Sequence, residues 1–146
     1  MSTAALDISS SLIDALYTTL NGNVTVSGIT YDVYKTVYSG QTNRAYVHIG
    51  DVIDNENGTK EEFIYEGSIA IESVDEQQTG NVSRSTVQAI NNKVRSLLKP
   101  TRTTVPTISG RSVTVFRLGG GTIREEQTKD KRTRYVITDI YEFIIS

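Results

Sequence analysis

The spacing of apolar residues alternates between a helical and a strand period along this chain, and that alternation restricts its fold more than any other feature. Residues 8–20 place apolar side chains on one stripe, with Asp7 or the serines after it as the N-terminal cap and Asn21-Gly22 as the stop signal. Residues 85–98 repeat the helical spacing until Pro100 ends it. The sequence therefore predicts two amphipathic helices.

Four further stretches have the two-residue period of half-buried strands, namely residues 45–53, 61–72, 112–118 and 134–145. Turn residues at positions 55–58 predict that the strands around Val47 and Tyr65 form an antiparallel hairpin. A second hairpin is expected to join the strands around Val113 and Ile137. Its connection, residues 119–131, is predicted to be a long, polar and mobile loop that becomes ordered against a partner protein.

The segment 24–34 is predicted to be one short strand interrupted at Gly28. The order of helix, hairpin, helix and hairpin then predicts an α+β fold: an antiparallel sheet of four to five strands with both helices packed on one face. A chain of 146 residues with ordinary apolar and charged fractions is expected to form a single domain, residues 1–146.

The sequence offers little for catalysis. His48 is its one histidine and Cys is absent, so neither a Cys-His pair nor a multi-histidine metal site can be built from one chain. His48 lies between Val47 and Ile49 in a predicted strand, where it is expected to point to the opposite face in a structural or surface role. We therefore expect no enzyme, no metal and no cofactor.

Two other motifs have equally plain interpretations. The triplet of glycines at 119–121 lacks the Lys and the Ser or Thr of a phosphate-binding loop, so a flexible turn is predicted. The adjacent carboxylates at 61–62 and 125–126 would point to opposite faces of a strand and are interpreted as solvated charge.

The same charges bear on partners. The basic run 124–134 is interrupted by acidic residues and has no aromatic residue before Tyr135. Such a segment is poorly suited to bind nucleic acid. No apolar run approaches the roughly 20 residues of a membrane span, and no basic stretch followed by a long apolar one opens the chain, so an intracellular soluble protein without a membrane partner is expected.

Charge is segregated along the chain. Twelve of the 17 acidic residues lie at or before position 83, and twelve of the 15 basic residues lie after it. If the fold places these segments on different sides, copies of the chain would have complementary faces that favour head-to-tail contact and ring closure. The alternative is an ordinary solvated surface whose charges happen to segregate along the sequence.

Contacts between proteins are expected to involve a tyrosine beside the polar segment 39–44 and the basic outer surface of the second helix. The charged connection of the second hairpin is expected to contribute as well. The predicted interface residues are Tyr38, Arg44, Arg84, Lys93, Arg95, Arg124, Lys129, Lys131 and Arg132.

The chain also resembles a known family in the order of its motifs. LIDALY at 12–17, ITYD at 29–32, AYVHIGD at 45–51 and an IAI strand at 69–71 feeding the helix at 87–98 are similar to the pattern of the tail terminator or tail-completion proteins of tailed bacteriophages. The resemblance spans nearly the entire chain, although each motif is weak alone. It implies a small α+β subunit that closes into a ring, commonly a hexamer, and implies nothing catalytic.

The long connection after residue 118 and the insertion at 101–111 depart from the family pattern. The resemblance therefore leaves two positions in the virion open. The chain could form the tail terminator itself, or another neck or connector ring with a different copy number, such as a dodecamer. Either implies a virion protein of the tail or neck, assembled in the host cytoplasm, with connector, neck and tail proteins as neighbours and DNA only as cargo of the lumen. The rival hypothesis is a small ligand-binding or regulatory domain that recognises an acidic metabolite through Arg117 and the Gly119 turn.

Overall fold

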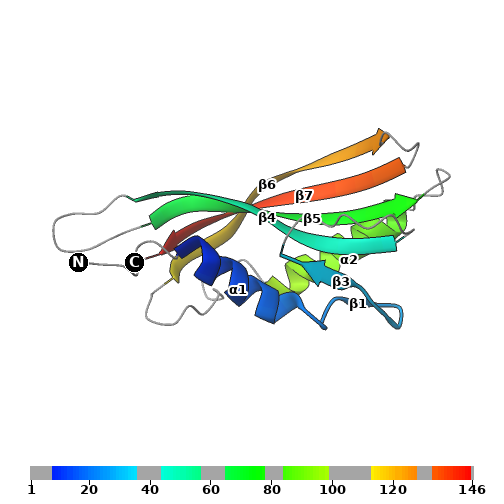
Figure 1. Ribbon diagram of the computed structural model, residues 1–146, viewed down its shortest axis with the longest axis horizontal. Helices are drawn as coiled ribbons and strands as arrows, with labels where there is room; N and C mark the ends of the chain where they lie inside the picture. The colour runs from blue at the N-terminus through cyan, green and yellow to red at the C-terminus, as the bar shows by residue number, and fades with distance from the viewer. Residues whose placement is uncertain are drawn as a thin grey trace.

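The computed structural model describes residues 8–35, 44–56, 65–77, 84–98, 113–127 and 133–145. These residues form helices and strands that are numbered in chain order, and Figure 1 labels all of them except β2: α1 (Ile8–Leu20), β1 (Thr25–Val26), β2 (Ile29–Thr30), β3 (Asp32–Tyr34), β4 (Arg44–Glu56), β5 (Tyr65–Gln77), α2 (Arg84–Leu98), β6 (Val113–Gln127) and β7 (Thr133–Ile145). The predicted α+β class is confirmed.

Helix α1 has the predicted bounds because its apolar residues return to one face every three or four positions. Leu12, Leu16 and Leu20 have no exposed surface. Gly22 follows with a φ of 80°, the left-handed conformation that commonly ends a helix and that glycine adopts without strain. The local stop signal in the sequence therefore has the predicted effect.

Helix α2 begins at Arg84, one residue before its predicted start, and ends at Leu98 as predicted. Val87, Ile90 and Val94 form most of its buried stripe. Asn91 is buried in the same stripe. A polar side chain at such a position needs a hydrogen-bond partner inside the protein.

The five-stranded sheet has the strand order β3-β4-β5-β7-β6. Both predicted hairpins are confirmed: β4 pairs antiparallel with β5, Val47 opposite Ser73, and β6 pairs antiparallel with β7, Val113 opposite Ile145. Strands β5 and β7 join the two hairpins, also antiparallel. The expectation of a purely antiparallel sheet is wrong, however, because the edge strand β3 runs parallel to β4.

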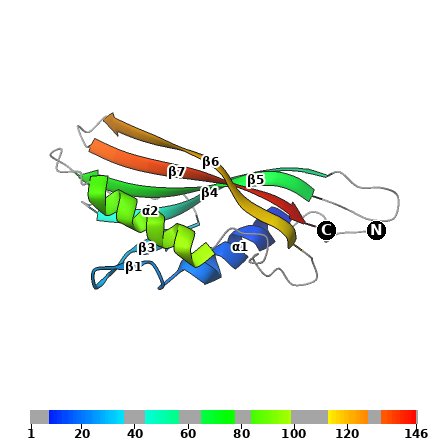
Figure 2. The same cartoon turned by 180° about the vertical axis from the view of Figure 1, so that it is seen from behind.

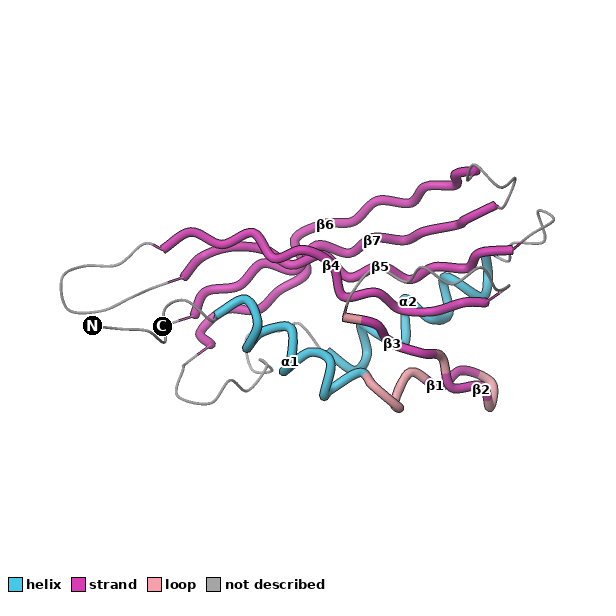
Figure 3. The backbone as a smooth tube through the Cα atoms, viewed as in Figure 1, coloured by secondary structure: helices cyan, strands magenta, loops and turns pink. Residues whose placement is uncertain are grey.

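The reversal that redirects β3 lies in the segment predicted to be a single interrupted strand. Ser27 and Gly28 have φ values of 52° and 82°, and two successive positive φ angles are the pattern of a type I′ hairpin turn. They fold the chain into a separate two-stranded hairpin in which Thr25 faces Thr30. The chain then enters the large sheet as β3; Figure 3 shows the small β1–β2 hairpin beside that edge.

Both helices pack on one face of the five-stranded sheet, as predicted, and Figure 2 shows them together on the same side of the twisted strands. We call this the helix face and the opposite one the outer face. The largest cluster of buried residues unites both helices with every strand of that sheet: Leu12, Leu16, Leu20, Val24, Val33, Val47, Ile49, Ile69, Ile71, Ile90, Val94, Leu98, Phe116, Tyr141, Phe143 and Ile145. Phe116 and Tyr141 stack within it, with ring centroids 5.2 Å apart.

Strand β6 extends well beyond its predicted end and includes the three glycines. The prediction of a long mobile loop is therefore wrong for residues 119–127, and residues 128–132 lie outside the described part of the chain. An ideal Cβ on Gly119 would lie 2.8 Å from the side chain of Glu142, and one on Gly121 would lie 2.8 Å from Asp139 Oδ1. These two glycines allow β7 to approach closely, so they serve the sheet rather than a turn.

Strand β5 is displaced relative to its predicted range of 61–72 and continues to Gln77. Its register against β7, which pairs Gln77 with Thr133, accounts for the extension. The buried polar residues Ser73 and Asp75 occupy helix-face positions there and break the apolar alternation that sequence reasoning follows. Residues 57–64, including positions 57 and 58 of the predicted turn, lie outside the described part.

Candidate interaction surfaces

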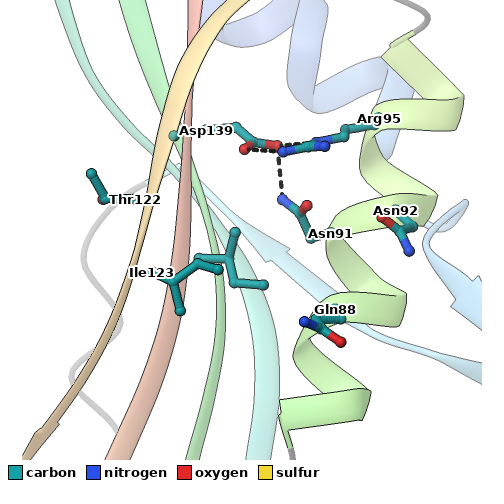
Figure 4. A pocket seen from close by; sticks show the side chains of 9 residues that line it. Gln88, Asn91, Asn92, Arg95, Thr122, Ile123 and Asp139 are labelled. Atoms are coloured by element: carbon teal, nitrogen blue, oxygen red, sulfur yellow. Dashed lines mark hydrogen bonds and ion pairs between the residues drawn. The ribbon is translucent and has the colours of Figure 1, made fainter.

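A buried carboxylate on the helix face binds α2 to β7. Asp139 is 1% exposed and accepts hydrogen bonds of 2.8 Å from Arg95 Nε, Arg95 Nη2 and Asn91 Nδ2. Arg95 and Asn91 reach the same carboxylate because residues four apart share one side of a helix. Figure 4 shows the three side chains meeting between the helix and the sheet.

Charge and close packing both hold this cluster together. The two bonds from one guanidinium to one carboxylate form a bidentate, charge-assisted pair. These bonds raise the pKa of Arg95 above its usual value, so the guanidinium remains charged. Gly121 of β6 lies against the same carboxylate, because a Cβ there would be 2.8 Å from Asp139 Oδ1 and 2.8 Å from the Thr138 carbonyl oxygen. The cluster thus joins α2, β6 and β7.

A groove of about 470 Å³ lies beside this cluster between α2 and β6, and we call it the α2–β6 groove (Figure 4). Gln88 and Asn92 of α2 form one wall, and Ile123 of β6 stands on the other. Ile123 is 59% exposed. The α2–β6 groove therefore combines polar side chains of α2 with one exposed apolar side chain of β6.

A second groove, of about 310 Å³, lies between the β1–β2 hairpin and the first half of α2, and we call it the hairpin groove. Ile29 and Tyr31 line it from the hairpin side, and Ser85 and Ala89 line it from α2. Ile29 is 55% exposed. Like the α2–β6 groove, it combines one exposed isoleucine with small or polar side chains of α2.

The outer face of the sheet carries a polar network across four strands. His48 Nδ1 lies 3.0 Å from Glu72 Oε1, while Glu72 Oε2 accepts hydrogen bonds from Arg124 Nη2 at 3.1 Å and from Thr138 Oγ1 at 3.4 Å. The prediction that His48 points away from the face of its two strand neighbours is confirmed, since those neighbours belong to the main core. Both carboxylate oxygens of Glu72 are bonded within the subunit, so the network cross-links the sheet.

This network makes the stability of the protein depend on pH. The hydrogen bond from His48, followed by that from Arg124, holds the pKa of Glu72 at about 2, below its usual 4.5, although burial acts in the opposite direction. A lowered carboxyl pKa contributes stability that is complete above pH 4.5 and is lost as the pH falls toward about 2.

We therefore expect Glu72→Gln to lower the free energy of unfolding by on the order of 2 kcal/mol at neutral pH. The wild type and the variant should converge near the folded pKa of about 2. Urea unfolding over a pH series measures this, with Glu66→Gln on the same strand as the control. A difference between wild type and Glu72→Gln that stays constant down to that pH would contradict the assignment.

Charges from the acidic and basic parts of the sequence also pair inside one subunit. Arg124 Nη2 lies 3.1 Å from Glu72 Oε2, and Arg134 Nε lies 3.2 Å from Glu76 Oε1. Both pairs connect carboxylates of the acidic β5 to arginines of β6 and β7. Part of the charge separation along the sequence therefore stabilises strand pairing and is not left for contacts between copies.

The predicted interface residues are not all brought together. Arg84 is exposed at the start of α2, with its guanidinium carbon 5.4 Å from the ring centroid of Tyr135, and Lys93 is half-buried on the same helix. Arg124 reaches across the outer face, away from α2. The expectation that Arg95 lies on the outward surface of its helix is wrong, because the buried carboxylate of Asp139 holds it against the sheet.

The other predicted interface residues carry less structural information. Arg44 is the first residue of β4. Outside the described residues lie Tyr38, Lys129, Lys131 and Arg132.

Sequence reasoning missed Asp139, Asn91 and the two exposed isoleucines. Signals existed for the first two: Asp139 occupies a core position in a strand that is otherwise apolar on that side, and Asn91 falls within the apolar stripe of α2. A polar residue at a core position predicts a buried partner. The exposure of Ile29 and Ile123 had no local signal, since it depends on which elements end beside them.

No group of three or more His, Cys, Asp or Glu within the described ranges is arranged to hold a metal ion. None of the described helices has the length and apolar character to cross a membrane. The hypothesis of an acidic-metabolite site requires a turn at Gly119, but that residue lies inside β6. The turn on which that hypothesis was based is therefore not formed.

Comparison with known proteins identifies the fold. No family model and no curated protein matches the sequence. Thirty chains of solved structures match the fold. One of them is a chain of the virion of a native gene transfer agent particle, with a TM-score of 0.71, 16% sequence identity, and coverage of 99% of this chain and 100% of that chain. At this identity the similarity establishes a shared fold over the full length.

Proposed function

We propose that this chain is a structural protein of a phage-like virion, and that its copies close into a ring at the tail end or the head-tail neck, where the ring joins the connector to the tail. The observation that carries the proposal is the similarity to a chain of a gene transfer agent virion, which covers 99% of this chain and all of the other at a TM-score of 0.71. Almost nothing of either chain is left unmatched, so the two folds agree in size as well as in arrangement. Fold similarity at 16% identity is an argument by analogy, so experiment must test the function.

The described surfaces agree with a structural role. Asp139 and Glu72, the carboxylates at the centre of the two polar clusters, use their oxygens to hold the subunit together. A structural role therefore explains these carboxylates better than chemistry does.

The proposed partners are copies of the chain together with a connector or neck protein on one side and a tail protein on the other. We favour six copies, and twelve is the alternative. The ring assembles in the host cytoplasm, remains in the virion at the tail or neck, and meets DNA only as cargo of its lumen.

Purified protein is expected to form a closed ring whose mass is six or twelve times the subunit mass of 16.1 kDa. Native mass spectrometry gives the copy number, and negative-stain electron microscopy gives the ring. Antibodies against the chain should label particles at the head-tail junction or the end of the tail. Label distributed over the head, or particles that lack the chain altogether, would refute the proposed position in the virion.

A further inference from the structure

Strand β6 ends the five-stranded sheet and, among the described residues, pairs with β7 alone. Over residues 120–127 this pairing is regular, with one residue opposite one, from Gly120 opposite Ile140 to Gln127 opposite Thr133. In an edge strand, half of the backbone N–H and C=O groups point away from the neighbouring strand. Residues 120–127 therefore form an open edge with a row of backbone donors and acceptors.

The helices leave this part of β6 uncovered. All residues from Gly119 to Glu125 are exposed, whichever face of the strand they occupy. Helix α2 packs on β4, β5 and β7, and Figure 2 shows it beneath those strands, with β6 continuing past them. The open edge is therefore accessible to another chain.

The usual protections of an edge strand are missing here. Soluble proteins protect such strands with proline, lysine or a bulge. Residues 120–127 contain neither proline nor lysine, and the nearest register shift lies before them, between Leu118 and Gly120. Arg124 lies against Glu72 of its own subunit instead of shielding the edge.

Gly120 points to a close approach from outside the subunit. A Cβ on Gly120 would meet nothing within 4 Å, so the packing of the subunit does not require a glycine at this position. A glycine inside a strand often marks a place where another backbone comes close. The open edge thus has the composition of a strand that accepts a further strand.

The α2–β6 groove lies directly beside the open edge. Every second side chain of an added strand would fall on the helix face, level with Gly121, which lines the groove. Gln88 and Asn92 of α2 line it with their amide groups. Arg95 uses Nε and Nη2 for its buried partner, and no described residue bonds to its Nη1. Such donors suit a side chain that accepts hydrogen bonds, namely Asn, Asp, Gln or Glu.

We propose that the open edge of β6 accepts an extended segment of a different virion protein, which adds a strand to the sheet and places a hydrogen-bond-accepting side chain in the α2–β6 groove. The segment is extended because another strand is what matches a row of alternating N–H and C=O groups. The inference rests on the proposed function and identifies how the subunit holds a connector or tail protein.

The geometry of the sheet favours a different protein over a second copy. At the opposite end of the sheet β3 has only three residues, which is too short to cover residues 120–127. Pairing of β6 with β6 of another copy is a two-fold contact that closes on itself and does not continue around a ring.

Two proline substitutions test the backbone contact, because proline has no N–H to donate. Thr122 and Ile123 are consecutive, so one of their N–H groups points to β7 and the other to the open edge. Of Thr122→Pro and Ile123→Pro, the variant that loses the outward N–H should melt close to wild type and the other should melt lower. The outward variant should still close the ring, but cells that make the particles with it should yield at least about 10-fold fewer complete tailed particles.

A second pair of variants serves if both proline variants unfold. Gly120→Lys introduces the residue that opposes strand addition at natural edges, and Gly120→Ala is its matched control. Both should fold, since a Cβ at this position has open space around it. Only Gly120→Lys should reduce the yield of complete particles.

Hydrogen exchange and cross-linking identify the occupant. The outward amides of residues 120–127 should exchange at least about 100-fold more slowly in the assembled particle than in the purified protein. A photoreactive benzoylphenylalanine in place of Thr122 should cross-link to a different protein of the particle, and a cross-link to another copy of this chain would overturn the assignment.

The outcomes separate this inference from the proposed function. Particles that contain the chain but show unchanged exchange at residues 120–127, or that assemble normally with the outward proline variant, would overturn the inference alone. A chain that forms no ring and is absent from the particles would overturn both.

Discussion

Replacing Arg95 with leucine is expected to lower the free energy of unfolding by about 3 kcal/mol, because it leaves a buried carboxylate without its charged partner. Asp139 is 1% exposed and would retain only the bond from Asn91. Arg95 is more accessible to water than Asp139, since the Arg95 side chain is 42% exposed. The expected loss therefore lies at the lower end of what breaking a buried ion pair costs.

A double-mutant cycle isolates the pair. Arg95→Leu, Asp139→Asn and the double variant are unfolded in urea at neutral pH, and the double variant should be more stable than the sum of the single effects predicts by about 1–2 kcal/mol. Lys93→Leu on the same helix is the control and should change stability by no more than about 0.5 kcal/mol. If Arg95→Leu costs no more than Lys93→Leu, the cluster does not anchor α2.

The anchoring role of Arg95 changes how the charge hypothesis must be tested. Reversing Arg95 and Lys93 together would disturb the fold through Asp139 as well as any contact between copies. Reversing Lys93 alone leaves the cluster intact and also leaves Arg84 in place beside Glu125 and Tyr135. An effect of that variant on ring assembly, and on its salt dependence, can be assigned to the surface between copies.

Both helices could be predicted from the sequence because their signals are local. The apolar stripe of α1 and its Asn21-Gly22 stop lie within a few residues of each other, and the same holds for α2 and Pro100. The direction of β3 could not, because it depends on a turn at Ser27, a residue type that seldom adopts a positive φ. Whether a strand joins an edge in one direction or the other is decided by such a reversal.

Within the candidate site, features with a local sequence signal could likewise be predicted, and features that depend on distant residues could not. The side to which His48 points could be predicted, since it needs only the alternation of one strand. The partner of Arg95 could not, because Asp139 lies 44 residues further along the chain. Residues that act through contacts this distant in sequence have no signature in their own segment, apart from a polar residue at an apolar position.

The glycine triplet illustrates the limit most clearly. Three glycines in a polar segment indicate a flexible turn by composition, yet they form part of a strand that must pass close to β7. Composition shows that these positions lack side chains, but it does not show which atoms lie where a Cβ would be. Two neighbouring glycines with different surroundings therefore allow the two interpretations to be separated.

Gly121→Ala is expected to lower the free energy of unfolding by about 2–3 kcal/mol, whereas Gly120→Ala should leave it within about 0.5 kcal/mol of wild type. A Cβ on Gly121 would lie 2.8 Å from the Thr138 carbonyl oxygen and 2.8 Å from Asp139 Oδ1, so either the β6–β7 pairing or the Arg95 bonds must shift. A Cβ on Gly120 would meet nothing within 4 Å. Urea unfolding of both variants measures the difference. In a flexible loop, the two substitutions would have equal and small effects, and that outcome would remove the close approach of β6 to Asp139 from the account of this fold.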